Sequence, residues 1–154
     1  KVLGKYRPDL IGIQCYTFDV GNVRKLLKVI KTWDPNIITV VGGSHVSSDP
    51  VRGFENLRDN LDFAFAGEAE IGFPTFVDIL NSNADSPDYS NVPGLIWKNG
   101  EEFVVNPQEM EDDLDQLGDP AWDLIRPELY PEAQHGAFFN SSPIAPIITT
   151  RGCP

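Results

Sequence analysis

Three short segments with small or polar side chains each follow an apolar run of the sequence. They are QCYTFD at residues 14–19, GGSHVSSDP at 42–50 and GEAE at 67–70. Adjacent glycines let a ligand approach the backbone, although a tight turn with positive φ also requires glycine. Serines in such a loop bind phosphate or cap a helix, and a loop histidine is a ligand, a hydrogen-bond donor or a solvated side chain. The sequence therefore predicts binding positions at Ser44 and His45, beside Gly42 and Gly43.

The third segment carries two carboxylates, Glu68 and Glu70. A carboxylate pair can act as acid and base in catalysis, but acids at the start of a helix are also ordinary partners of the helix dipole. The sequence has no G-x-G-x-x-G, no G-x-x-x-x-G-K-[ST] and no nucleophile-elbow motif. It therefore predicts a binding site rather than a self-contained catalytic centre.

Alternating strand-like and helix-like segments position these three loops. The β-rich run PDLIGIQ (8–14) precedes DVGNVRKLLKVIKTW (19–33), whose apolar residues recur at helical spacing. The next segments predict a strand at 34–43, a short helix at 49–57, a strand at 62–67 and a helix at 70–81. This order predicts an α/β fold with a doubly wound, Rossmann-like parallel sheet. In such a sheet the loops at the carboxyl ends of the strands converge on the ligand.

The pattern changes after residue 82. GLIWKNGEEFVV (94–105) predicts an appended β-hairpin around Asn99 and Gly100, and an acidic, extended C-terminal linker follows it. We therefore divide the chain into an α/β domain at 1–82, a hairpin with linker at 83–143, and the start of a truncated further domain at 144–154. The stub KVLGKYR before the first strand looks like the tail of a preceding element, so we expect the domain's first strand to be missing.

Composition excludes several classes of function. The chain has 154 residues, of which 41% are hydrophobic and 23% charged, as in a globular domain. Its net charge of -11 argues against nucleic acid as a partner, because phosphate binding needs clustered Lys and Arg. No apolar run approaches the roughly 20 residues of a membrane helix, and no signal-peptide pattern opens the chain. Two cysteines are too few for a disulfide framework, which predicts a cytoplasmic protein.

Taken in order, PDLIGI, VVGGSHVSSDP and DFAFAGEAEIGFPTFVDIL resemble the cobalamin-binding domain that precedes the catalytic barrel in class B radical S-adenosylmethionine (SAM) enzymes. The terminal TTRGCP resembles the entry to their C-x-x-x-C-x-x-C loop, whose thiolates hold a [4Fe-4S] cluster. The resemblance implies a parent protein that uses cobalamin, SAM and this cluster, with the radical SAM barrel C-terminal to the present chain. Methyl transfer, a cyclisation or a related radical reaction is the chemistry that it implies.

Position by position, the resemblance implies a cobalamin site formed by the three loops. Gly42 and Gly43 would lie beside the nucleotide tail of cobalamin, and Cys153 would be the first of the three thiolate ligands of the cluster. Gln14 and Tyr16 depart from the serine and leucine that are common in this family, and the axial-histidine motif D-x-H-x-x-G is absent. The implied cofactor-binding positions are Gln14, Tyr16, Thr17, Gly42, Gly43, Ser44, His45, Gly67 and Glu68.

We expect the chain alone to bind cobalamin without catalysing a reaction, because the radical machinery would lie in the barrel. One alternative is a degenerate domain that serves only as a scaffold or substrate-docking wall of the same enzyme. Another is a receiver or flavodoxin-like signalling domain. A receiver needs an aspartate at a strand end, where this sequence offers Gln14, Gly42 and Gly67.

Overall fold

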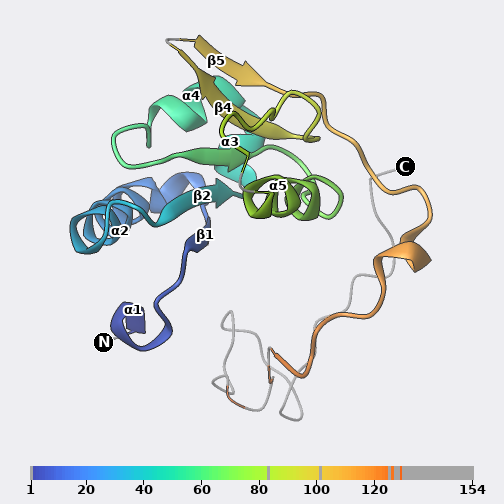
Figure 1. The fold of residues 1–154 in the computed structure, drawn as a ribbon, viewed down its shortest axis with the longest axis horizontal. Helices are drawn as coiled ribbons and strands as arrows, with labels where there is room; N and C mark the ends of the chain where they lie inside the picture. The colour runs from blue at the N-terminus through green and yellow to red at the C-terminus, as the bar shows by residue number, and fades with distance from the viewer. Residues whose placement is uncertain (1, 83, 101, 125, 127–128, 130–154) are drawn as a thin grey trace. The chain divides into compact units, whose positions relative to one another are not determined.

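The computed structural model describes residues 2–82, 84–100, 102–124, 126 and 129 (Figure 1). The chain divides into two compact units, Lys1–Leu114, which contains the sheet, and Asp115–Pro154. The elements are α1 (Val2–Tyr6), β1 (Leu10–Gln14), the 3-10 helix η1 (Thr17–Asp19), α2 (Val20–Trp33), β2 (Ile38–Gly42), α3 (Ser44–Ser48), α4 (Pro50–Glu55), β3 (Phe63–Phe65), α5 (Gly72–Asn81), β4 (Leu95–Asn99), β5 (Glu102–Val105) and the 3-10 helix η2 (Leu114–Leu117).

One mixed sheet organises the first unit, with strand order β1-β2-β3-β4-β5. Strands β1, β2 and β3 are parallel, with Gln14 opposite Gly42 and Val41 opposite Ala64. Strand β4 is antiparallel to β3, and β5 is antiparallel to β4. The predicted α/β fold is confirmed, and the hairpin continues the parallel sheet instead of standing apart from it.

Helices cover both faces of the sheet and form two apolar cores. On one face, Leu27 of α2, Val46 of α3 and Phe54 of α4 pack in a cluster with Val41 of β2. On the other face, Phe76 of α5 packs in a second cluster that includes residues of β2, β3 and β4. Because β2 contributes to both clusters, its sequence is almost entirely apolar, as expected for a parallel strand covered on both sides.

The hairpin is fixed to the rest of the sheet by a buried asparagine and by aromatic contacts. The Asn106 side-chain amide donates to the carbonyls of Tyr89 and Val92, at 2.6 and 2.8 Å, and its oxygen accepts from Trp97 Nε1 at 3.3 Å. The Phe103 ring lies 5.1 Å from the Phe54 ring, centroid to centroid. These contacts tie the segment before β4 and the helix α4 to the hairpin.

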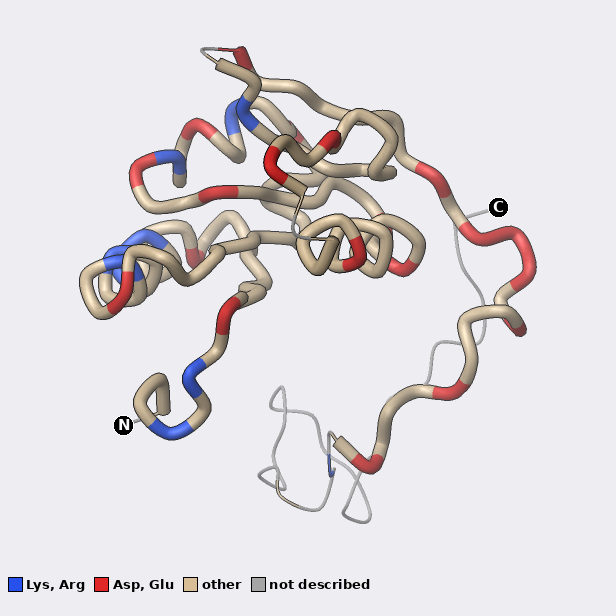
Figure 2. The backbone as a smooth tube through the Cα atoms, in the orientation of Figure 1, with Lys and Arg blue, Asp and Glu red and all other residues tan. Residues whose placement is uncertain are grey.

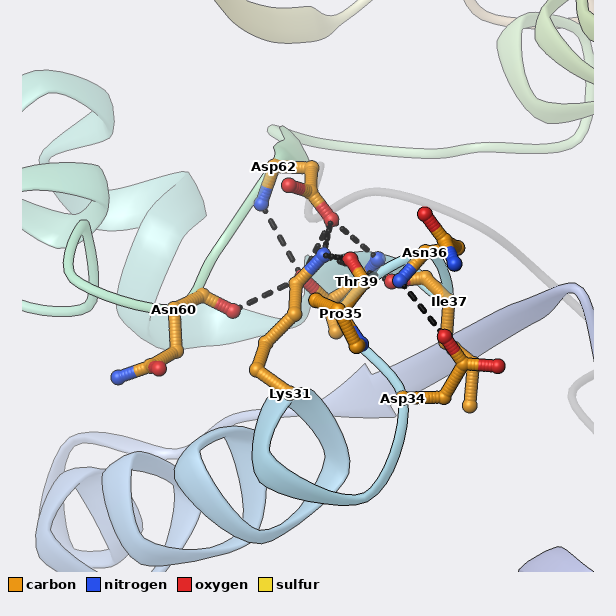
Figure 3. Close-up of polar contacts among 8 residues, drawn as sticks. All are labelled: Lys31, Asp34, Pro35, Asn36, Ile37, Thr39, Asn60 and Asp62. Carbon is orange, nitrogen blue, oxygen red and sulfur yellow. Dashed lines mark hydrogen bonds and ion pairs between the residues drawn. The ribbon is translucent and has the colours of Figure 1, made fainter.

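A polar network closes the end of the sheet at which β2 begins (Figure 3). Asp62 Oδ2 accepts from Lys31 Nζ at 2.5 Å and from the Thr39 backbone N–H at 2.8 Å. The Thr39 hydroxyl lies 2.9 Å from Asp62 Oδ2 and 2.9 Å from the Asn60 carbonyl oxygen. The network joins the last turn of α2 to the start of β2 and to the residue before β3.

Helix α3 is a short element that the sequence pattern did not predict. Its five residues, SHVSS, include three serines, which have modest helix propensity, so the segment looked like a loop. Val46 anchors it in the core, because its side chain is fully buried in the cluster shared with α2 and α4. Tertiary packing therefore outweighs local preference here. No helix in the described part of the chain is long and apolar enough to cross a membrane.

Candidate functional site

The ends of the three parallel strands bring the predicted site residues to one edge of the sheet. We define the carboxyl edge as residues 14–18 at the end of β1, 42–48 at the end of β2 and 66–68 after β3. Hydrogen bonds connect all three segments. The Cys15 N–H donates to the Gly42 carbonyl at 2.8 Å, and the Gly67 N–H donates to Ser47 Oγ at 2.9 Å. The nine predicted cofactor positions therefore share one edge.

Gly42, the last residue of β2, and Gly43, which follows it, have different roles. Gly43 has a φ of +100°, and a Cβ at this position would lie 2.9 Å from the Cys15 carbonyl oxygen. The protein's own backbone therefore requires glycine at Gly43, both for its conformation and for the close approach of the β1 loop. Gly42 is open by comparison, because the nearest atom to an added Cβ is the Phe65 carbonyl oxygen at 4.0 Å. The predicted space beside the backbone is thus limited to Gly42.

His45 is a buried residue that contacts the β1 loop. The residue is 8% exposed, and its backbone N–H donates to the Cys15 carbonyl at 3.1 Å. Nδ1 lies 3.3 Å from Thr17 Oγ1, within hydrogen-bond distance, whereas Nε2 is buried without a hydrogen-bond partner in the described part of the chain. The imidazole therefore faces the protein interior, and it does not offer an open ligand to solvent.

Two of the three serine hydroxyls of α3 hydrogen-bond to the backbone of the edge, and the third belongs to an exposed residue. Ser47 Oγ donates to the Gly43 carbonyl at 3.0 Å while it accepts from the Gly67 N–H. Ser48 Oγ donates to the His45 carbonyl at 3.1 Å. Ser44, at the first position of α3, is exposed. Of the three hydroxyls, Ser44 is the one best placed to contact a molecule at the carboxyl edge.

The loop after β3 is contacted by Gln108, a residue that the sequence did not predict at this edge. Gly67 has a φ of +75°, and the side chain of Gln108, which follows β5, occupies the space where its Cβ would lie. Glu68 is half-buried and Glu70 is exposed. The two acids precede α5, whose first turn contains no acidic residue, so the structure does not place them inside the helix. Sequence reasoning missed Gln108, because only the pairing of the hairpin with β3 brings it to this edge.

Two aromatic rings are exposed at the end of β1. Tyr16 is 44% exposed and Phe18 83% exposed, and their rings stack with centroids 5.6 Å apart and an interplanar angle of 7°. The Gln14 side-chain amide donates to the Tyr16 hydroxyl at 3.1 Å. Gln14, Tyr16 and Thr17 were predicted from the sequence, whereas Phe18 was not, because it resembles an ordinary apolar residue ahead of α2.

Charge and thiol chemistry at the edge are limited. The carboxyl edge contains no Lys or Arg, whereas four basic residues lie on α2 (Figure 2), namely Arg24, Lys25, Lys28 and Lys31. A ligand at the edge would therefore meet backbone N–H groups, hydroxyls and aromatic rings instead of fixed positive charge. Cys15 is fully buried, and burial together with the Asp19 carboxylate raises the pKa of its thiol.

No group of three or more His, Cys, Asp or Glu side chains that could hold a metal ion occurs within the described ranges. The predicted cluster ligand Cys153 lies outside the described residues.

Comparison with known proteins identifies relatives of this chain. The model of the B12 binding domain family matches residues 2–77. The cobalamin-dependent radical SAM methyltransferase TokK of Streptomyces tokunonensis is 33% identical over 105 residues, which are 68% of this chain and 15% of TokK. The cytidylyl-2-hydroxyethylphosphonate methyltransferase of Streptomyces wedmorensis is 27% identical over 178 residues, covering 99% of this chain and 32% of that enzyme.

A solved structure shares the fold. The cobalamin-dependent S-adenosylmethionine radical enzyme OxsB with aqua-cobalamin bound matches with a TM-score of 0.65 and 19% identity, covering 80% of this chain and 17% of OxsB. The chain therefore spans less than a third of the length of TokK, the Streptomyces wedmorensis enzyme and OxsB.

Proposed function

Because residues 2–77 are a B12-binding domain of the type found in cobalamin-dependent radical SAM methyltransferases, we propose that the carboxyl edge is the cobalamin site. The observation that supports it is the convergence of three strand ends on one surface that combines an open glycine, exposed hydroxyls and exposed aromatic rings. Ligands of open parallel sheets bind at this edge. Cobalamin would supply a corrin-bound cobalt, able to carry a methyl group.

The residues present fit an organic cofactor with a large uncharged surface. Gly42 leaves room beside the backbone, and Gln14, Thr17 and Ser44 are exposed polar groups that can hydrogen-bond to amide side chains or to a nucleotide tail. His45 is too buried to reach a cobalt ion from this edge without a rearrangement. We therefore propose that it holds the Thr17 side chain in position. On this proposal the chain binds and orients cobalamin and catalyses no step alone.

We further propose that the parent protein is a radical SAM enzyme, with methyl transfer as its first candidate reaction. TokK and the Streptomyces wedmorensis enzyme are both methyltransferases, and TokK is a cobalamin-dependent radical SAM methyltransferase. In the parent, Cys153 would be one thiolate ligand of a [4Fe-4S] cluster, SAM would bind at that cluster, and the C-terminal barrel would be the partner of this domain. A cytoplasmic location belongs to the same proposal.

A scaffold domain without cobalamin is the second candidate, and two observations favour it. The backbone of Cys15 fills the space over Gly43, and the side chain of Gln108 fills the space over Gly67. Of Gly42, Gly43 and Gly67, Gly42 alone then leaves space beside the backbone for a ligand. A titration with the cofactor separates the two candidates.

The test is a visible-absorbance titration of the chain with hydroxocobalamin. We expect saturation in the micromolar range for the wild type and at least a roughly tenfold weaker affinity for Gly42→Val, because the added side chain occupies the open position. Gly12→Val is the matched control: Gly12 lies in β1, and an added Cβ would have no heavy atom within 4 Å. A flat response of the folded wild type would overturn the proposal in favour of the scaffold.

A further inference from the structure

The stacked rings of Tyr16 and Phe18, which we call the aromatic pair, are exposed and are not accounted for by packing among the described residues. Phe18 has the highest exposure among the large hydrophobic residues of the described part of the chain, at 83%. An apolar ring left in water forgoes the stabilisation that burial would give it, and exposed apolar groups at a binding edge mark interaction sites. The aromatic pair is therefore a candidate contact surface.

The loop that carries the aromatic pair is fixed at several points. Cys15 is hydrogen-bonded through its N–H to Gly42 and through its carbonyl to the His45 N–H. The Thr17 hydroxyl, between the two rings in sequence, lies within hydrogen-bond distance of the buried His45 ring. The rings are thus displayed by a braced segment, and a ligand that covers them pays little to order the loop.

The chemistry of the surface indicates what would cover it. The two rings present flat apolar faces, with the Tyr16 hydroxyl as their polar group, and the rest of the carboxyl edge contains the Glu68 carboxylate but no Lys or Arg. Such a surface suits a large flat conjugated ring with apolar methyl substituents better than it suits a phosphate or a charged peptide. Within cobalamin, the corrin macrocycle has this character, whereas the nucleotide tail carries a phosphodiester.

We propose that the aromatic pair is the platform on which the corrin macrocycle packs. The inference rests on the proposed function and adds to it the part of the cofactor that the β1 loop contacts, including Phe18, a residue absent from the predicted site. Gly42 lies opposite Gln14 in the β1–β2 pair, so the open glycine and the aromatic pair would both be available to hold the corrin at this edge.

The experiment compares hydroxocobalamin with dicyanocobinamide, which has the corrin but lacks the nucleotide base, in absorbance titrations of the same chain. Phe18→Ala and Tyr16→Ala should each raise the Kd for both corrinoids about tenfold. Tyr16→Phe keeps the ring and should bind as the wild type does. The matched control is Val29→Ala, which trims an apolar side chain that is 58% exposed on α2, outside the carboxyl edge.

Each result of these titrations either supports or overturns the proposed corrin contact. Equal loss for both corrinoids supports packing against the macrocycle. A loss confined to hydroxocobalamin, or a wild type that binds no cobinamide, would assign the affinity to the nucleotide and overturn the inference while leaving the proposed function intact. Unchanged binding by both alanine variants would also overturn it and would leave the rings to a protein partner. A wild type that binds neither corrinoid would remove the proposed function and the inference together.

Discussion

Single residues at the carboxyl edge owe their properties to burial and backbone geometry. Cys15 shows this most clearly, because its side chain is wholly buried while its backbone N–H and C=O hold the β1 and β2 loops together. Burial and the Asp19 carboxylate raise the pKa of the thiol above its ordinary value of 9.0. The folded protein therefore keeps the thiol proton at a pH where the unfolded chain has lost it.

This raised pKa has a consequence for stability. Above the ordinary thiol value, unfolding releases a proton, so the free energy of unfolding should fall as the pH rises, by at most about 1.4 kcal/mol per pH unit. Urea unfolding from about pH 8 to about pH 10 measures the slope. Cys15→Ala should show a shallower slope, because it lacks the thiol. Burial also raises the pKa of Tyr89, but this residue is present in both proteins and contributes equally to both slopes. Identical slopes would contradict the assignment.

At the residue scale, the sequence predicted where the edge residues lie better than what each of them does. Gly43 was correctly placed after a buried strand, but its glycine is required by its φ of +100° and by the Cys15 carbonyl, neither of which follows from sequence spacing. Phe18 was overlooked because an apolar residue next to an amphipathic helix is normally buried. Its exposure depends on the 3-10 turn that separates β1 from α2.

At the scale of elements, the Asp62 network locks the strand ends opposite the carboxyl edge. Asp62 holds the Thr39 backbone N–H and the Lys31 ammonium, and the Thr39 side chain is fully buried. The Asp62 carboxylate thus adds to the backbone pairing that sets the register of β2 against β3. Because the predicted site is built from the other ends of these same strands, the network contributes to placing the carboxyl edge.

Removing this carboxylate should therefore destabilise the whole unit. Asp62→Ala leaves the Thr39 N–H without its acceptor and should cost about 2–3 kcal/mol in the free energy of unfolding. Asp62→Asn keeps an acceptor oxygen and should cost less. The exposed Asp59 provides the control variant Asp59→Ala. Urea unfolding checks the order of the four proteins, and an Asp62→Ala midpoint equal to that of the control would show that the network contributes no stability.

Most elements could be predicted because their patterns are local. The helix at Val20–Trp33 and the β2 strand follow from periodicity and from an apolar run. Helix α3 could not, since its serines favour loops and only the burial of Val46 holds it. The pairing of the hairpin with β3 was also open, because strand pairing over such a sequence separation leaves no local signal.

At the scale of the whole molecule, residues 2–77 match the B12 binding domain, and the carboxyl edge is the cobalamin site that we propose for it. The order of short motifs was enough to predict the B12-binding family, which the match to residues 2–77 confirms. Cys153 and the domain boundary at 144 lie outside the described residues, so the cluster remains a prediction. The chain spans 15% of the length of TokK and 32% of the length of the Streptomyces wedmorensis enzyme.

Hydrogen–deuterium exchange with and without hydroxocobalamin tests most directly that the carboxyl edge binds the cofactor. We predict slower backbone exchange in residues 14–18, 42–48 and 66–68, and unchanged exchange in the second half of α2 and in the β4–β5 hairpin tip. Protection confined to the α2 surface or the hairpin, with the three strand-end segments unaffected in a cobalamin-bound chain, would contradict the account.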